Sequence, residues 1–464
     1  MSIPLPDLEE RTGIHQVIAG KARLSKQQAL DIFHNAPLFT LGKWATQVAN
    51  RIHGEKIRTY VIDRNINYTN VCSATCTFCA FKRKAGDHDA YTLDAEQIHQ
   101  KIDQLLAIGG TQILLQGGMN PQLPLPYYTQ LLSSIQTKYP QVHIHAFSPP
   151  EFVEFVAVLD IPGFPTTAAG KSHTLPEEIW LKKLDHILKT FKEAGLNSIP
   201  GGGAEMFAQH VRKRIGQGKA TTEQWLTVMS QAHKIGLSTS ATMMFGHLES
   251  IEDRIDHMLL FRDAQDTALQ QHYPGKYHAF IAWPYQPENT PLGKLPQYDP
   301  ESDEPFPGEN LDHPLNGKML RLAGATDYLR TQALSRLLLD NIHSIGSSWV
   351  TMGPHIGQTA LAFGASDMGS VMMEENVVSS AGTTYALNEQ LICHLIRDAG
   401  FIPAQRDNDY NILQTHDTDR APDLQVKDWS TMRIKALHHQ TDAPSSCHES
   451  QEAVEPTALT IEGQ

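Results

Sequence analysis

The 464-residue sequence lacks any apolar run of the roughly 20 residues that a membrane-spanning helix needs. Its first 21 residues also lack the basic stretch followed by an apolar stretch that is typical of a secretory signal. Positive charge is in deficit, since 38 Lys and Arg face 51 Asp and Glu and leave a net charge of −13. Such a charge repels phosphate backbones and anionic lipids, so we expect no nucleic-acid partner and no membrane partner.

Cysteine is scarce as well. The chain has five, and three of them, Cys72, Cys76 and Cys79, stand close together in the sequence. A secreted disulfide framework would use more cysteines and distribute them along the chain. The cluster therefore predicts a metal site in a cytoplasmic protein. We interpret Cys393 as a helix cysteine and Cys447 as a thiol in the C-terminal tail.

Short strand-like runs alternate with amphipathic helices about eight times between residues 59 and 410. This alternation predicts an α/β fold, specifically a parallel (β/α) TIM-type barrel of eight strands, with an open doubly wound sheet as the alternative. The predicted strands include residues 59–67, 112–115, 142–147, 238–245, 278–283 and 346–350. One of the predicted helices covers residues 204–215.

The chain divides into three predicted regions. Residues 1–58 are expected to form an N-terminal helical extension, and residues 59–410 the barrel. Residues 411–464 form a polar C-terminal tail, with disorder predicted toward its end at 441–464, where the composition cannot bury enough apolar surface. Glycine, proline, cysteine and acidic residues cluster just after the predicted strands. Those strand ends meet on one face of a barrel, where the active sites of such barrels lie.

The cysteine loop has the spacing CxxxCxxC. Three thiolates match three irons of a cubane cluster and leave the fourth iron open to another ligand, whereas electron carriers use four cysteines. One alternative is a zinc site completed by His88, because zinc normally takes four protein ligands. Three reduced structural cysteines are another alternative. A non-catalytic metal protein would need a fourth ligand, for which His88 and Cys393 are the candidates.

The cysteine loop, with the aromatic Phe78 before its last cysteine, resembles the signature of the radical S-adenosylmethionine (SAM) superfamily. In that superfamily the open iron binds SAM, and one electron from the cluster cleaves SAM to methionine and a 5′-deoxyadenosyl radical. The resemblance implies that Cys72, Cys76 and Cys79 hold a 4Fe-4S cluster and that Phe78 lies near the adenine.

The resemblance extends to the turn after the second predicted strand. Gln116, Gly117 and Gly118 match the family's glycine pair and the residue before it, where backbone carbonyls hold the methionine amino group. The resemblance implies that these residues bind the cofactor, and that a side chain at the glycines would block its close approach. Glu151, after the third predicted strand, is a candidate contact for the cofactor ribose.

Longer motifs resemble the group that contains aminofutalosine synthase, cyclic dehypoxanthine futalosine synthase and the deazaflavin cofactor synthases. They are residues 65–70, 109–118, 148–151, 199–205 and 243–249, and residues 348–354 and 373–382 resemble the cyclic dehypoxanthine futalosine synthases most closely. The likeness runs from about residue 31 to residue 407. The stretches 162–174 and 296–315 depart from it, and neither is expected to touch the cysteine loop.

The resemblance implies a reaction in menaquinone biosynthesis, the cyclisation of dehypoxanthine futalosine. The deoxyadenosyl radical would remove the hydrogen at the ribose 4′ carbon, and the new carbon radical would add to the benzoate ring. Loss of one electron and one proton would then restore aromaticity. Aminofutalosine synthase, or another member of the group, is the alternative. The resemblance also implies a one-electron donor such as a flavodoxin or a ferredoxin.

Two further polar residues are predicted to be catalytic. Glu205 follows three glycines and is expected to accept hydrogen bonds from substrate hydroxyls; the alternative is a carboxylate at a helix N-terminus. His247 is expected to hold substrate or the adenosyl ribose, and the alternative is a buried histidine with its hydrogen bonds satisfied. Weaker candidates are His143, His145, Glu249, Gln286, Asn289, Glu374, Glu375 and Asn376. We interpret Arg212, Lys213 and Arg214 as a solvated helix end, with contact between one of them and the substrate benzoate as the alternative.

Overall fold

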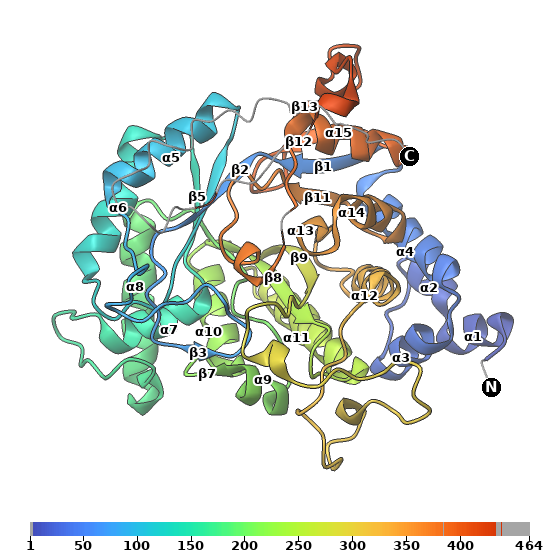
Figure 1. Cartoon of the computed structure of the whole chain (residues 1–464), viewed down its shortest axis with the longest axis horizontal. Coiled ribbons are helices and arrows are strands. Elements are labelled where there is room, and N and C mark those ends of the chain that lie inside the picture. Colours follow the sequence, from blue (N-terminus) through green and yellow to red (C-terminus); the bar gives the residue numbers. More distant parts are fainter. Residues whose placement is uncertain (1–2, 384, 433–437, 439–464) are drawn as a thin grey trace, which may run out of the picture.

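The computed structural model describes residues 3–383, 385–432 and 438, so the predicted disorder at 441–464 lies outside the described residues. Helices at the N-terminus lead into a ring of parallel strands that further helices surround (Figure 1). The N-terminal helices are α1 (Leu5–Thr12), α2 (Ile14–Ile18), α3 (Lys26–Asn35) and α4 (Leu38–His53). No helix in the described ranges is long and apolar enough to cross a membrane.

The strands of the ring pair in parallel and return to their start. β1 (Ile57–Val61) and β2 (Asp63–Asn67) are halves of one strand, interrupted only at Ile62. β1 pairs with β11 and β2 pairs with β4, so this strand closes the ring. The others, in order, are β4 (Gln112–Gln116), β5 (His143–Ala146), β6 (Ser198–Ile199), β8 (Ser238–Phe245), β9 (Tyr277–Pro284), β10 (Ser344–Gly346) and β11 (Asp367–Ser370). The predicted parallel (β/α) barrel is confirmed.

The helices around the barrel have amphipathic faces and defined starts. In α5, Ile98, Ile102 and Leu105 lie on one face and are fully buried. Capping boxes at Asp94, Ser148, Thr221 and Ser250 fix where four of these helices begin. The helices are α5 (Ala95–Ala107), α6 (Leu125–Lys138), α7 (Pro149–Val158), α8 (Glu177–Ala194), α9 (Gln209–Ile215), α10 (Thr222–Lys234), α11 (Ile251–Gln270), α12 (Ala325–Leu338), α13 (Trp349–Met352), α14 (Pro354–Ala360) and α15 (Glu389–Asp398).

Two predicted elements are wrong in their bounds. The predicted strand 346–350 is β10 at Ser344–Gly346 followed by the helix α13, because pairing with β9 ends at Gly346. The β-branched and aromatic residues after it favoured a strand locally, but the barrel offers them no partner strand. The predicted helix 204–215 begins only at Gln209, since Glu205 has a left-handed backbone conformation (φ 45°) that a helix does not accept.

A C-terminal hairpin covers the end of the barrel opposite the cysteines. β12 (Ile402–Arg406) pairs in parallel with β1, and β13 (Ile412–Thr415) returns antiparallel, so regular structure continues past residue 410. In the turn between them, Asn408 donates to Ser198 Oγ at 3.2 Å, and the Tyr410 ring lies 6.4 Å from that of His278. Both partners lie at the amino ends of strands, so the turn forms a floor under the barrel.

Candidate functional site

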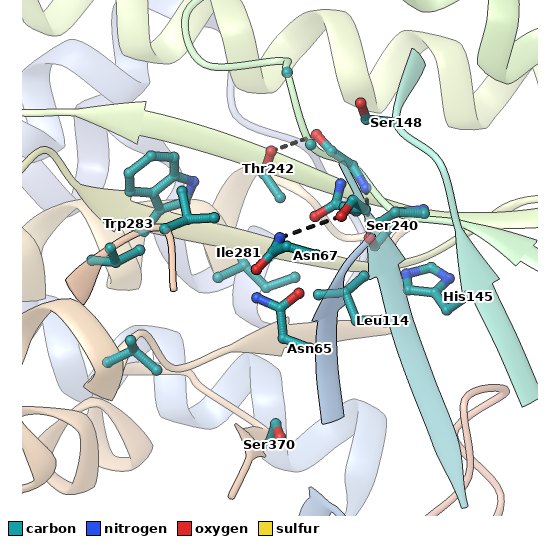
Figure 2. Close-up of a pocket in the computed structure, with 18 of the residues that line it drawn as sticks. Asn65, Asn67, Leu114, His145, Ser148, Ser240, Thr242, Ile281, Trp283 and Ser370 are labelled. Atoms are coloured by element: carbon teal, nitrogen blue, oxygen red, sulfur yellow. Dashed lines mark hydrogen bonds between the residues drawn. The ribbon is translucent and has the colours of Figure 1, made fainter. Parts of the chain in front are cut away.

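A cavity of about 500 Å³ runs from the cysteine loop into the barrel. The three cysteines line one end, and Arg406, Asn408 and Tyr410 of the hairpin line the other. Figure 2 shows Asn65, Asn67 and His145 among the strand residues whose side chains lie around this interior. A cavity of this volume suits a small-molecule substrate together with part of a cofactor.

The cysteine loop is held by backbone hydrogen bonds from several directions. β3 (Thr75–Cys76) pairs antiparallel with β7 (Gly216–Gln217), and Thr77 N donates to Ile215 O at 2.9 Å. On the other side, Ser73 N donates to Met119 O at 2.8 Å. These contacts fix the three cysteines at the carboxyl ends of the strands, where the sequence predicted them.

The thiols occupy a largely dry position. Cys76 is buried, and Cys72 and Cys79 are half-buried. Burial raises the pKa of the Cys76 thiol to about 11, and it also raises the pKa of Cys72. A bound positive centre keeps such thiols deprotonated, because coordination removes the thiol proton.

The described residues offer no ready site for a single metal ion. No group of three His, Cys, Asp or Glu side chains among them is placed to hold one. The proposed fourth ligands lie elsewhere: the His88 side chain is 94% exposed, and Cys393 is buried on α15. This arrangement fits three ligands of a 4Fe-4S cluster with one iron left open.

The glycine pair approaches the cysteine loop itself. A Cβ on Gly118 would lie 2.1 Å from the carbonyl oxygen of Val71, and one on Gly117 would lie 2.6 Å from the Tyr68 ring. Gly118 N also donates to Thr69 O at 2.8 Å. Both glycines line the cavity. The protein's own packing therefore already excludes a side chain at either position. This constraint adds to the close approach of the cofactor that the resemblance implies.

Glu151 connects two of the strand-end turns. Its carboxylate accepts hydrogen bonds from Ser148 N and Oγ, both at 2.7 Å, from the Tyr68 hydroxyl at 2.7 Å and from Gly117 N at 3.2 Å. Burial raises its pKa to about 7, although these hydrogen bonds act in the opposite direction. Glu151 lines the cavity, but protein donors already occupy both oxygens. Its geometry favours positioning Gly117 over contacting the cofactor ribose.

Glu205 faces the cavity as half of an ion pair. Its Oε1 lies 2.6 Å from Lys219 Nζ, while Oε2 accepts no hydrogen bond from any described residue. The Lys219 ammonium lies 4.9 Å from the centre of the Phe78 ring, directly beside the cysteine loop. Glu205 precedes α9 by four residues, so the helix-terminus alternative is wrong.

Arg212 holds both partners of that ion pair in place. Its guanidinium donates to Gly203 O at 3.0 Å, to Ala204 O at 2.6 Å and to Ala220 O at 2.9 Å. The first two carbonyls immediately precede Glu205 and the third immediately follows Lys219. Arg212 is buried with its donors occupied, so it positions the pair and does not reach the cavity.

The stretch 162–174 and the cysteine loop share one carboxylate partner, Glu154. Glu154 Oε2 accepts from Gly170 N at 2.8 Å, and Glu154 Oε1 accepts from the Ser73 hydroxyl at 2.7 Å. Glu154 is buried on α7. A local sequence motif could not show this link, because its three members are far apart in the chain.

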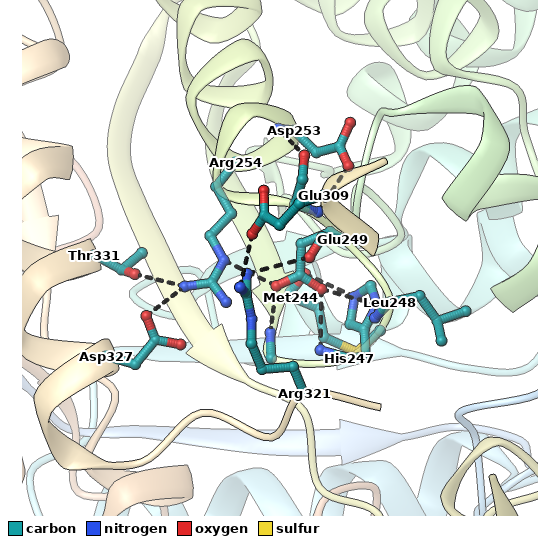
Figure 3. Close-up of polar contacts among 12 residues, drawn as sticks. Met244, His247, Leu248, Glu249, Asp253, Arg254, Glu309, Arg321, Asp327 and Thr331 are labelled. Atoms are coloured by element: carbon teal, nitrogen blue, oxygen red, sulfur yellow. Dashed lines mark hydrogen bonds and ion pairs between the residues drawn. The ribbon is translucent and has the colours of Figure 1, made fainter. Parts of the chain in front are cut away.

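His247 is not among the residues that line the cavity. Figure 3 shows it within a network of polar contacts with Met244, Leu248 and Glu249. It is fully buried; its Nδ1 accepts from Leu248 N at 2.7 Å, and its Nε2 lies 3.1 Å from Met244 O. Glu249 accepts from Gly246 N at 2.6 Å and from Arg254 Nε at 2.8 Å. Burial would raise the pKa of Glu249, but the charges of His247 and Arg254 lower it to about 2. This turn is a buried network, and we leave His247 out of the proposed site.

The weaker candidates separate in the same way. His145 lines the cavity, and its Nδ1 lies 2.6 Å from Ser198 Oγ, which is also 2.6 Å from His143 Nε2. Glu374 is buried against Arg64 and Lys101, away from the cavity. Glu375 lines it, while Gln286, Asn289 and Asn376 do not.

Sequence analysis missed Lys219 and the floor residues Arg406, Asn408 and Tyr410. Lys219 follows the two-residue strand β7, which no periodicity reveals. Arg406 binds Asp367 through two contacts of 2.8 and 3.0 Å. Arg406 is the last residue of β12, a strand added to the barrel beside β1. Nothing in the local sequence indicates that the turn after this strand lines the cavity.

Comparisons with known proteins agree with this geometry. The radical SAM superfamily model matches residues 66–261, and the CofH/MqnC C-terminal region matches residues 310–418. A protein of Halalkalibacterium halodurans named cyclic dehypoxanthine futalosine synthase is 39% identical, over 88% of this chain and 96% of its own. The Streptomyces coelicolor protein of that name is 35% identical, over 86% and 88%.

Two further proteins extend the comparison. The aminodeoxyfutalosine synthase of Thermus thermophilus is 32% identical over 87% of this chain and 95% of its own. The crystal structure of methylornithine synthase has a TM-score of 0.56 at 15% identity, over 84% of this chain and 97% of its own, and shows the same fold. The chain therefore belongs to the radical SAM superfamily, as an enzyme of the futalosine-synthase type that uses a 4Fe-4S cluster and S-adenosylmethionine.

Proposed function

We propose that this enzyme cyclises dehypoxanthine futalosine to cyclic dehypoxanthine futalosine in menaquinone biosynthesis. The step is hydrogen abstraction at the ribose 4′ carbon, followed by addition of the resulting radical to the benzoate ring. The single observation that carries the proposal is the cavity of about 500 Å³, which joins the three cysteines to the polar interior of the barrel. An intramolecular addition needs such an enclosure, because the two reacting parts of one substrate must be held together and water kept out.

When bound, the cluster and SAM supply a carbon-centred radical that removes a hydrogen atom from the substrate. In the proposal, Cys72, Cys76 and Cys79 hold the cluster. The Gly117–Gly118 turn would form the wall beside the bound cofactor, and the hydrogen bond from Gly117 N to Glu151 keeps this turn in place. Phe78 and Gln116 both line this part of the cavity and complete the proposed cofactor site.

The substrate would occupy the part of the cavity beyond the cofactor. Glu205 Oε2 is the best placed acceptor for a ribose hydroxyl, because it lines the cavity while Oε1 is occupied by Lys219. Deeper in the barrel, the interior is lined by the polar side chains Asn65, Asn67 and His145. The Arg406–Tyr410 turn limits how far a ligand extends toward the floor.

The test is mass spectrometry after anaerobic incubation of the reconstituted, reduced protein with SAM and dehypoxanthine futalosine. We expect 5′-deoxyadenosine and a product that has lost two hydrogen atoms relative to the substrate. Parallel incubations with the substrates of aminodeoxyfutalosine synthase provide the comparison. Turnover of those substrates, with dehypoxanthine futalosine left unchanged, would assign the enzyme to the alternative reaction.

A further inference from the structure

The outer face of the cysteine loop brings three chain segments together. Thr77, between two of the cluster cysteines, donates from N to Ile215 O at 2.9 Å, and its carbonyl accepts from Leu292 N at 2.8 Å. Its hydroxyl lies 3.3 Å from Arg214 O. Thr75 is exposed and Thr77 is half-buried, so this part of the cysteine loop lies at the surface of the described residues.

Basic residues surround this loop although the chain as a whole is acidic. Lys213 and Arg214 end α9 next to Ile215, and Lys294 follows Leu292 by two residues; all three are exposed. Lys82, half-buried, has its Nζ 3.4 Å from Ala74 O. None of the four makes an ion pair with a described residue. We call Lys213, Arg214 and Lys294 the basic rim.

Two acidic residues near this face are engaged in ion pairs. Asp89 pairs with Arg83 at 2.5 Å, and Glu205 pairs with Lys219 inside the cavity. Glu288, at the start of the loop after β9, is exposed and makes no ion pair with a described residue. Four exposed acids, Asp299, Glu301, Asp303 and Glu304, lie on the long loop after β9, which projects beyond α9 (Figure 1). The rim is thus a positive surface beside the cysteines, with a negative loop next to it.

We propose that the basic rim is the docking surface for an acidic one-electron carrier protein of the flavodoxin kind. The inference rests on the proposed radical SAM function, since that chemistry starts only after one electron from outside has reduced the cluster. Opposite charge attracts such a carrier and orients it, and the cysteine loop at Thr77 gives the electron its shortest exposed route to the cluster. The acidic loop after β9 repels the same partner and so restricts its orientation.

The experiment measures the dissociation constant of a recombinant flavodoxin for the full-length protein by calorimetry, at about 50 and about 200 mM NaCl. We expect K213E/R214E to weaken binding about tenfold or more at the lower salt, with the difference shrinking at the higher salt. K21E/K43E is the matched control: it changes the net charge equally, and both of its lysines are exposed on or near the N-terminal helices, away from α9 (Figure 1). The control should change the constant by about twofold or less.

Activity with two reductants separates docking from catalysis. With dithionite, K213E/R214E should produce 5′-deoxyadenosine at the wild-type rate, whereas with flavodoxin its rate should fall in parallel with binding. Equal weakening by both double variants would mean that only net charge matters, and no weakening by K213E/R214E would place the partner elsewhere; either result overturns the proposal. Calorimetry needs no substrate, so failure of dehypoxanthine futalosine to cyclise leaves this test intact.

Discussion

Glu205 and Glu249 occupy similar places in the sequence and different places in the molecule. Each follows a barrel strand through a glycine-containing turn, each is buried, and each pairs with a Lys or Arg side chain, Lys219 or Arg254. Glu205 lines the cavity, and one of its oxygens has no donor among the described residues. Glu249 is surrounded by backbone and arginine donors and has no contact with the cavity. A buried carboxylate at a strand end is thus a candidate for binding substrate only if one of its oxygens is not already hydrogen-bonded within the protein.

The other contacts of Arg254 explain why Glu249 has a structural role. Arg254 also binds Asp327 at 2.7 Å and Thr331 at 3.1 Å, so it ties the turn after β8 to α12 (Figure 3). A buried charge held by several partners destabilises the fold strongly when one partner is removed. Lys219, in contrast, has Glu205 as its carboxylate partner and lies over Phe78 beside the cysteines.

Among substitutions at the cavity, we expect the one at Cys76 to have the largest effect on activity. Cys76→Ala should abolish 5′-deoxyadenosine formation, because the remaining two thiols cannot hold the cluster. The barrel should still fold, since the loop lies at its rim. Iron analysis, circular dichroism and chromatography of the product measure both effects. Cys393→Ala is the control, because Cys393 is buried away from the cavity and should keep its iron. Normal turnover by Cys76→Ala would disprove the ligand assignment.

Glu249→Gln tests the structural role of the buried network after β8. Removing this charge leaves Arg254 without its main buried partner, and we expect a loss of about 3 kcal/mol in the free energy of unfolding. Urea unfolding followed by circular dichroism measures it. The kcat/KM of the protein that remains folded should stay within about threefold of wild type. A loss of activity without a loss of stability would return Glu249 to the candidate site.

Glu205→Gln tests the opposite expectation, a loss of activity larger than the loss of stability. It removes a charged acceptor at the cavity wall, and we expect kcat/KM to fall roughly ten- to hundred-fold, equivalent to about 1.5–3 kcal/mol. Its loss of stability should be smaller than that of Glu249→Gln, because the cavity lets water reach Lys219. Melting and steady-state kinetics on the same preparation decide the matter. A shifted melt with unaltered kinetics would remove Glu205 from the site.

The smallest expected effect is a pH dependence specific to Glu249. Its pKa is about 2 in the folded protein against a usual 4.5, so the folded state binds its proton more weakly than the unfolded state. Its contribution to stability is complete above pH 4.5 and is lost as the pH falls from 4.5 toward 2. The difference in urea midpoint between wild type and Glu249→Gln should therefore shrink over that range. A difference that stays constant down to about pH 3 would contradict the assignment.

Local patterns in the sequence predicted the elements whose formation depends on local properties. Helices with a capping residue and an apolar face, such as α5 and α11, were found because both signals lie within a few residues. The short strands β6 and β10 were predicted less well, since two or three residues have no periodicity and pairing alone defines them. The hairpin turn under the barrel was missed because its contacts with Ser198 and His278 join segments that are far apart in the chain.

The sequence by itself determined the barrel, the cysteine loop and the chemistry that three cysteines at this spacing imply, because spacing and periodicity are local properties. Only the tertiary structure decided that Glu205 faces the cavity with Lys219, that His247 does not, and that Arg406 to Tyr410 form the floor. Those relations join segments far apart in the chain. They depend on which face of each strand points into the barrel and on which polar groups are already hydrogen-bonded. Neither property can be predicted from a single stretch of the sequence.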